Sequence, residues 1–352
     1  MKKIIQGLQR CIDEKKRAVI ATIIKTEGSS YQSVGSRCLL DEDGRIDGIV
    51  SGGCVEQDLM ERVTEILSNH KPETCCYDFR SENDFLWGMG VGCDGAVTLF
   101  LQPFDPVAFP EEAMELFHHY KEIYESDKMY SLATVIRSSD EKKVPVGMVK
   151  KLSLDLQEKH SGLICLNMDG VNTECYVDWV APRQQVVIFG AGPDAVPLVK
   201  QLATIEWRTT VVDHRPYYAK ASNFPGAERV QLINRSDYDT IRLNEKVFAI
   251  IMTHNFTLDV KLMKRLIQNP VSYIGILGSK KRIGKILNCL SEEEIKRFPK
   301  GIVHSPIGLD IGASTPEEIA ISIVAEMIAF KKKKNAAFRV VEPTISLHSQ
   351  VI

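Results

Sequence analysis

One stretch of the 352-residue chain decides the fold of its second half: Val186-Val187-Ile188-Phe189-Gly190-Ala191-Gly192-Pro193-Asp194-Ala195. Its first four residues predict a buried strand, and the G-x-G-x-x-A pattern that follows predicts a tight turn into a helix. Gly190 permits the turn, Gly192 lets the backbone approach a phosphate, and Ala195 allows close packing of helix and strand. Together with Pro193 they predict an anion site at the helix N-terminus, where unpaired N–H groups and the helix dipole attract negative charge.

The segments that follow extend this stretch into a sheet. Residues 185–330 alternate strand and helix patterns, a pattern typical of a parallel, doubly wound, Rossmann-like sheet. The final helix should begin at Thr315 as N-cap with Pro316 at its first position. The expected strands span 186–190, 209–213, 247–253 and 273–278.

The acidic residue expected about 20 residues after the glycines is Asp213, at the end of the second strand, where it could bind ribose hydroxyls. Arg215 could instead pair with a phosphate. The fold does not identify the ligand. NAD(P) is one possibility, and a Rossmann scaffold that binds another ligand is the alternative.

Further polar residues follow the other strands. His254 follows the third strand, and Ser279 with the cationic run Lys280–Arg282 follows the fourth. Carboxyl ends of parallel strands meet at one edge, where such sheets bind ligands. The structural alternatives are a packed loop histidine for His254 and a solvated helix start for the cationic run.

The first part of the chain predicts a compact α/β domain over residues 1–182, with a core of 1–105 and an extension of 106–182. The Rossmann-like domain should occupy 183–335 and a tail 336–352. The overall prediction is therefore an α/β protein with an N-terminal compact domain and a C-terminal doubly wound sheet.

Ser51-Gly52-Gly53-Cys54-Val55-Glu56 joins an expected strand to a helix over 55–69. Cys54 would lie at the helix N-terminus, a position that lowers a thiol's pKa, and the glycines would let a ligand approach the backbone. A buried cysteine at a tight turn is the alternative. A second glycine-rich loop, 88–95, presents Cys93.

Composition excludes several classes of protein. The chain has 44 Lys and Arg against 46 Asp and Glu, so its net charge of -2 argues against a general electrostatic grip on nucleic acid. We find no apolar run of about 18 residues for a membrane span, no secretory signal and no metal-binding motif. Nine cysteines without a C-x-x-C pair are typical of a reduced, cytosolic protein.

Together these motifs resemble the XdhC/CoxI family, the accessory proteins that mature xanthine dehydrogenase and related molybdenum hydroxylases. One departure is Gly92-Cys93-Asp94-Gly95, where the family often has Gly-Cys-Gly-Gly. The resemblance rests on Glu27–Ser30, Gly35–Arg37, Ser51–Glu56, Gly92-Cys93, Val187–Pro193, Val212–Arg215, Thr253–Asn255, Gly275–Ser279 and Pro306–Gly312.

The resemblance implies a cytosolic, dimeric protein that is not the dehydrogenase itself. Such proteins bind molybdenum cofactor while a cysteine desulfurase helps install its terminal sulfido ligand, and then pass it to the apo-hydroxylase. Cys54 and Cys93 would be the reactive thiols. An NAD(P)-dependent oxidoreductase and a sulfurtransferase carrying a persulfide on Cys54 are the alternatives. The expected cofactor-binding residues are Gly28, Ser29, Ser30, Arg37, Ser51, Gly52, Gly53, Gly190, Gly192, Pro193, Asp213, Arg215, His254 and Ser279.

Overall fold

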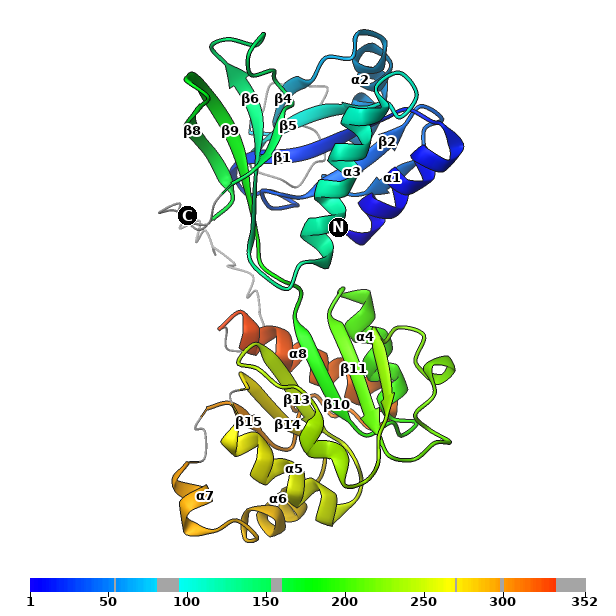
Figure 1. Cartoon of the computed structure of the whole chain (residues 1–352), viewed down its shortest axis with the longest axis vertical. Coiled ribbons are helices and arrows are strands. Elements are labelled where there is room, and N and C mark those ends of the chain that lie inside the picture. Colours follow the sequence, from blue (N-terminus) through cyan, green and yellow to red (C-terminus); the bar gives the residue numbers. More distant parts are fainter. Residues whose placement is uncertain (54, 81–94, 153–159, 270, 298–300, 334–352) are drawn as a thin grey trace, which may run out of the picture. The chain divides into compact units, whose positions relative to one another are not determined.

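The chain divides into two units, residues 1–183 and 184–352, in a computed structural model (Figure 1). The structure describes every residue except 54, 81–94, 153–159, 270, 298–300 and 334–352. Cys54 and Cys93 therefore lie outside the described residues. Within the described part of the chain, helices long and apolar enough to cross a membrane are absent.

The first unit contains a five-stranded antiparallel sheet with the order β3-β2-β1-β5-β4. Helix α2 packs on one face of this sheet, and α1 and α3 pack on the other. The bounds are α1 Lys2–Glu14, β1 Ala18–Gly28, β2 Arg37–Asp41, β3 Ile46–Gly48, α2 Glu56–Asn69, β4 Glu73–Asp78, β5 Gly95–Phe104 and α3 Pro110–Glu125.

Strand β1 shows why the sheet is covered on both faces. Successive side chains of a strand point to opposite faces. Val19 and Ala21 accordingly pack in the core beneath α2, whereas Ala18 and Ile20 pack in the core beneath α1 and α3. A strand that is apolar on both faces, as this one is, needs a helix layer on each side.

A second antiparallel sheet completes this unit, with the order β7-β6-β9-β8. Ile24 and Phe100 of the first sheet pack with Ile136 and Tyr176 of the second. The region that the sequence predicted as an extension, 106–182, thus contributes helix α3 to the first sheet and forms a second sheet. Its strands are β6 Tyr130–Ser138, β7 Val149–Lys151, β8 Gly162–Met168 and β9 Val171–Val180.

The second unit is a six-stranded parallel sheet with the order β12-β11-β10-β13-β14-β15. The predicted Rossmann-like architecture is confirmed. The bounds are β10 Gln185–Phe189, α4 Ala195–Thr204, β11 Arg208–Asp213, β12 Arg229–Leu232, β13 Val247–Ile251, α5 Phe256–Gln268, β14 Tyr273–Ile276, α6 Lys280–Leu287, α7 Glu292–Lys296, β15 Val303–His304 and α8 Pro316–Lys331.

Helices cover both faces of the parallel sheet (Figure 1). Val186 and Ile188 of β10 pack in the core beneath α4 and α8, and Val187 and Phe189 pack in the core beneath α5 and α6. Thr315 caps α8 as predicted, because its side chain accepts a hydrogen bond from the backbone N–H of Glu318 in a capping box.

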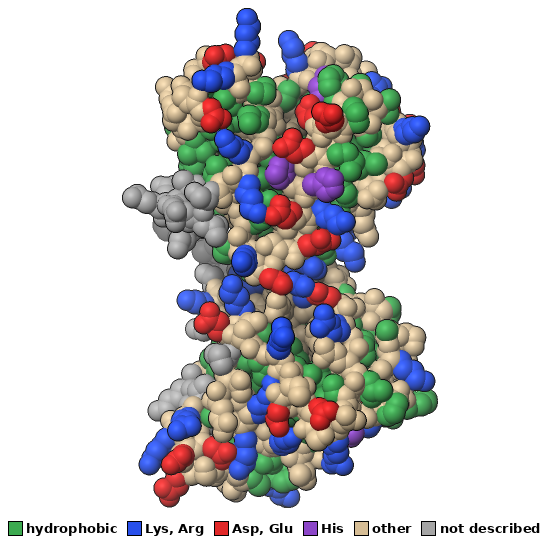
Figure 2. All heavy atoms as spheres, viewed as in Figure 1, with side chains coloured by type: hydrophobic (Ala, Val, Ile, Leu, Met, Phe, Trp, Pro, Cys, Tyr) green, Lys and Arg blue, Asp and Glu red, His purple; other side chains and the backbone are tan. Residues whose placement is uncertain are grey.

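Charges of both signs are mixed on the face of the protein that Figure 2 shows. Figure 2 shows Lys and Arg side chains interspersed with Asp and Glu over the visible face of each unit. This distribution agrees with the near-zero net charge of the chain.

Candidate functional site

The parallel sheet reverses its strand order between β10 and β13. If the six strands are numbered by their order along the chain, they lie across the sheet in the order 3-2-1-4-5-6. The connections after β10 and after β13 therefore lead away in opposite directions. Such a switch point leaves a crevice at the carboxyl ends of the two strands, where ligands of this fold class bind. Here the glycine loop 190–194 follows β10, and Thr253–Asn255 follow β13.

The glycine loop is held tightly against its neighbours. Gly190 has φ of 124°, and a Cβ added to it would lie 2.3 Å from the carbonyl oxygen of Met252, so only glycine fits there. The N–H of Gly190 donates to the carbonyl of Val212 at 2.9 Å. The loop therefore has a fixed position between the ends of β11 and β13.

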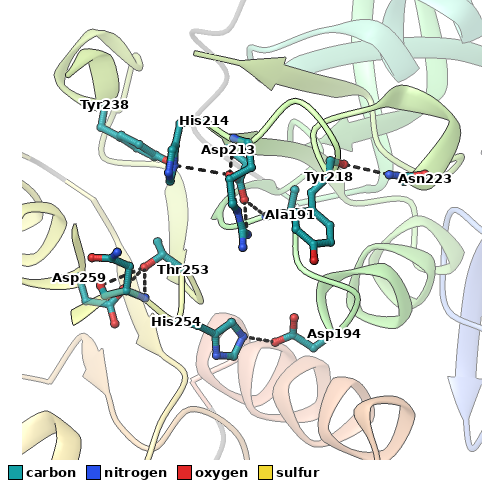
Figure 3. Close-up of polar contacts among 12 residues, drawn as sticks. Ala191, Asp194, Asp213, His214, Tyr218, Asn223, Tyr238, Thr253, His254 and Asp259 are labelled. Atoms are coloured by element: carbon teal, nitrogen blue, oxygen red, sulfur yellow. Dashed lines mark hydrogen bonds and ion pairs between the residues drawn. The ribbon is translucent and has the colours of Figure 1, made fainter. Parts of the chain in front are cut away.

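Asp213 lies at the end of β11, as predicted, but its carboxylate is already engaged (Figure 3). It is 1% exposed and accepts hydrogen bonds from Ala191 N at 2.7 Å and from Arg215 N, Nε and Nη2 at 2.7–3.0 Å. Burial alone would raise the pKa of Asp213, but the Arg215 guanidinium and the backbone amides outweigh it and lower the pKa. A ribose could reach this carboxylate only if Arg215 moved.

Asp194 and His254 meet across the switch point. Nε2 of His254 lies 2.8 Å from Oδ2 of Asp194, and Figure 3 shows the two side chains pointing toward each other. His254 has a left-handed backbone with φ of 57°. A Cβ added to Gly192 would lie 2.5 Å from Oδ1 of Asp194. The carboxylate therefore lies over the glycine loop.

A cleft of about 680 Å³ opens beside this pair. That size is typical of a small-molecule site. It lies in the second unit between the ends of β13 and β14, the segment 306–314, and helices α4 and α8. Its walls are mainly apolar, and a few polar side chains line it. The apolar residues include Leu198, Met252, Leu277, Ile307, Leu309 and Ile319, and the polar ones are Asp194, His254, Lys280, Asp310, Ser314 and Ser322.

Ser279 and the cationic run begin helix α6. Ser279 caps the helix by accepting from the backbone N–H of Arg282 at 3.3 Å. Arg282 donates to the buried carboxylate of Asp259 at 2.6 Å, and Thr253 donates to the same carboxylate. Lys280 differs from Arg282, because it lines the cleft and forms no ion pair with any described residue. The helix start thus presents one cation to the cleft.

The loop before α2 is organised by Glu56, which was not predicted as a site residue. Its carboxylate accepts from Ser51 N at 3.0 Å, from Val50 N at 3.4 Å and from the Ser51 hydroxyl. Burial would raise the pKa of Glu56, but these donors lower it. Gly52 and Gly53 are exposed, with open space beside them. The sequence signal that could have suggested this role is a glutamate at the first position of a helix that follows a glycine-rich loop.

The other predicted residues of the first unit are placed as follows. Gly28 ends β1 with φ of 67°, and Ser30 donates to the carbonyl of Gln32 at 2.8 Å. The carbonyl of Ser29 lies 2.4 Å from a Cβ added to Gly95, so this loop packs against the start of β5. Arg37 is buried in an ion pair with Asp178. The structure thus brings the 28–30 loop to the start of β5 and directs Arg37 into the packing between the sheets.

The described residues contain no group of three or more His, Cys, Asp or Glu side chains that could hold a metal ion. A metal centre built from this part of the protein is therefore not a candidate site. The cleft of the second unit and the loop 50–56 of the first unit remain the two candidates.

Comparison with known proteins covers both units. Residues 11–78 match the family described as XdhC and CoxI, and residues 186–327 match the XdhC Rossmann domain. A protein of Bacillus subtilis (strain 168), named as a probable xanthine dehydrogenase subunit, is 32% identical over 336 residues, which are 93% of this chain and 97% of that protein. The chain belongs to the XdhC/CoxI family.

Two other similar proteins extend the comparison of this XdhC/CoxI protein. The molybdenum cofactor insertion chaperone PaoD of Escherichia coli (strain K12) is 22% identical over 319 residues, covering 90% of this chain and 84% of PaoD. A crystal structure from Bacillus halodurans, described as a xanthine dehydrogenase, superposes with a TM-score of 0.74 at 29% identity and covers 94% of this chain and 96% of that one.

Proposed function

We propose that this protein is an accessory factor for the maturation of xanthine dehydrogenase or a related molybdenum hydroxylase. It would bind molybdenum cofactor as cargo, assist its sulfuration and pass it to the apo-hydroxylase, rather than act as an independent enzyme. Family membership supports the accessory role, and the match to a molybdenum cofactor insertion chaperone spans both units.

The observation that carries the cargo proposal is the cleft at the switch point. Apolar walls such as Leu198, Met252 and Ile307 suit the faces of a pterin ring, and Lys280 offers a charge for its phosphate. The cleft volume of about 680 Å³ is adequate for such a ligand. We assign the cofactor-binding role to this cleft and to the exposed glycines of the loop 50–56.

The thiol role is proposed for Cys54, with Cys93 as a second thiol. Soft thiolates suit a transient hold on the metal or a transfer of sulfur. A cysteine desulfurase would supply that sulfur, and the protein would work in the cytoplasm as a homodimer. These assignments extend the family resemblance.

The NAD(P)-dependent oxidoreductase remains the second candidate because of the glycine loop. The geometry favours this candidate less, because the Asp213 carboxylate is already paired with Arg215 and the Asp194 carboxylate covers Gly192. Both obstacles would need to move before a dinucleotide could bind in the usual way.

A retention assay separates the two candidates. The protein is mixed with molybdenum cofactor and gel-filtered, and the protein fraction is assayed for oxidised pterin fluorescence and for molybdenum. NAD(P) binding is measured on the same samples. We expect about one pterin per chain, less in Cys54→Ser and unchanged in Cys76→Ser, which removes an exposed thiol of β4. Clear NAD(P) binding without pterin would refute the proposal.

A further inference from the structure

The carboxylate of Asp194 lies where a Rossmann fold would receive a pyrophosphate. Oδ1 comes within 2.5 Å of a Cβ added to Gly192, the glycine whose role is to let the phosphates approach. Asp194 is also the residue just before helix α4, and its side chain makes no capping hydrogen bond. A pyrophosphate in the usual place would meet a negative charge instead of an open anion site.

The backbone amides of the loop are also largely engaged. Ala191 N donates to Asp213 at 2.7 Å, and Ala195 N and Val196 N donate to carbonyls of the loop itself at 3.0 and 3.3 Å. Pro193 has no N–H to offer. The loop therefore offers few of the donors that make a helix N-terminus attractive to phosphate.

His254 holds this carboxylate in the cleft. The His254 ring contacts only Oδ2 of Asp194. A carboxylate has about four acceptor positions, so most of them are left for other donors. Oδ1 and the remaining acceptor position of Oδ2 are thus able to receive donors from a ligand. The Asp194 side chain is 25% exposed and lines the apolar cleft. The site therefore suits a flat ligand whose edge carries two neighbouring N–H donors.

We propose that Asp194 recognises the 2-amino-4-oxo-pyrimidine edge of a pterin and that the same carboxylate excludes dinucleotide pyrophosphates from the cleft. The choice of a pterin rests on the proposed function. The ring N–H and the amino group of that edge form two parallel donors, which match a carboxylate as a guanidinium does. Leu198, Met252 and Ile307 would then contact the ring faces.

The test uses two ligands that differ at this edge. Pterin carries the amino group, whereas lumazine carries an oxygen in its place and would repel the carboxylate. Fluorescence titration of the full-length protein should show pterin binding at least about tenfold more tightly than lumazine, the size expected for hydrogen bonds to a charged group. Asp194→Asn should abolish the preference, and Glu245→Gln, which alters an exposed carboxylate of the same unit outside the cleft, should keep it.

Several results would overturn the inference. They are equal affinity for pterin and lumazine, no binding of either, a preference that survives in Asp194→Asn, or NAD⁺ binding more tightly than pterin. Guanosine shares the edge, so guanosine binding that depends on Asp194 in the absence of pterin binding would reassign the ligand to a purine. Cofactor retention without the pterin preference would overturn only this inference, whereas the preference without cofactor retention would overturn only the proposed function.

Discussion

The guanidinium of Arg37 donates to the carboxylate of Asp178 at 2.6 Å, and both side chains are 7% exposed. Arg37 belongs to β2 of the first sheet and Asp178 to β9 of the second. The Arg37 guanidinium also lies over the ring of Tyr120, with Cζ 5.2 Å from its centre. One buried ion pair thus connects the two sheets of the first unit.

Breaking this pair should destabilise the first unit. Arg37→Met leaves the Asp178 carboxylate buried without its partner, and we expect the free energy of unfolding to fall by about 3–5 kcal/mol. The double variant Arg37→Met/Asp178→Leu should lose less, because no charge remains buried. Urea denaturation measures both. Arg137→Gln, at an exposed ion pair of β6, should change stability by less than about 0.5 kcal/mol. An equally small effect of Arg37→Met would contradict this account.

Asp213 should make the stability of the second unit depend on pH. Its pKa is lowered in the folded state, so its contribution is fully present above the ordinary Asp pKa of about 4 and is lost as the pH falls through the lower folded value. The stability difference between wild type and Asp213→Asn should therefore be largest at neutral pH and shrink in acid. Urea midpoints at pH 7 and at pH 3 give that difference. A pH-independent difference would rule out the linkage, and the exposed Asp310→Asn serves as control.

Glu56 should order the loop before α2. Glu56→Ala leaves Val50 N, Ser51 N and the Ser51 hydroxyl without their acceptor. Hydrogen exchange of these two amides should accelerate by about tenfold or more, since a hydrogen bond to a charged group contributes about 1.5–3 kcal/mol. Cofactor retention should fall in parallel. Glu61→Ala, an exposed change on the same helix, should leave exchange unaltered. Unchanged exchange in Glu56→Ala would show that the loop does not depend on this carboxylate.

The described thiols should fall into two reactivity classes. Cys76, Cys165 and Cys289 are exposed and should be alkylated in the native protein. The others are buried, and burial raises the pKa of Cys11 and Cys75 to about 11, so they should react only after unfolding. Alkylation of the protein at pH 8, with and without urea, followed by mass spectrometry of its peptides, identifies the cysteines that react in each state. Native modification of Cys11 would contradict the packing of α1 against the sheet. The buried thiols are Cys11, Cys38, Cys75 and Cys175.

Local signals made much of the second unit predictable. The strand before Gly190 and the cap at Thr315 depend on neighbouring residues, and both were confirmed. Strands β12 and β15 were not predicted. They are only four and two residues long, and Arg229 and His304 interrupt their apolar pattern. Such short strands acquire their structure from pairing with a neighbour rather than from their own sequence.

The site was predictable in position but not in its pairings. The sequence placed His254 and the glycine loop at the same edge of the sheet, because parallel strands end there, but it did not single out Asp194. Their contact depends on β10 lying beside β13, which brings together residues 60 positions apart. The pairing of Arg282 with Asp259 has the same origin, since it spans two helices. Contacts of this kind arise from tertiary packing and have no local sequence signal.

Delivery of the cofactor tests the central claim most directly. An apo molybdenum hydroxylase is incubated with sulfurated molybdenum cofactor, either free or first loaded onto this protein, and hydroxylase activity is followed over time. The account predicts faster and more complete activation from the loaded protein, at about one cofactor delivered per chain, and no hydroxylase activity from the protein alone. Equal activation by free and by loaded cofactor would contradict the account.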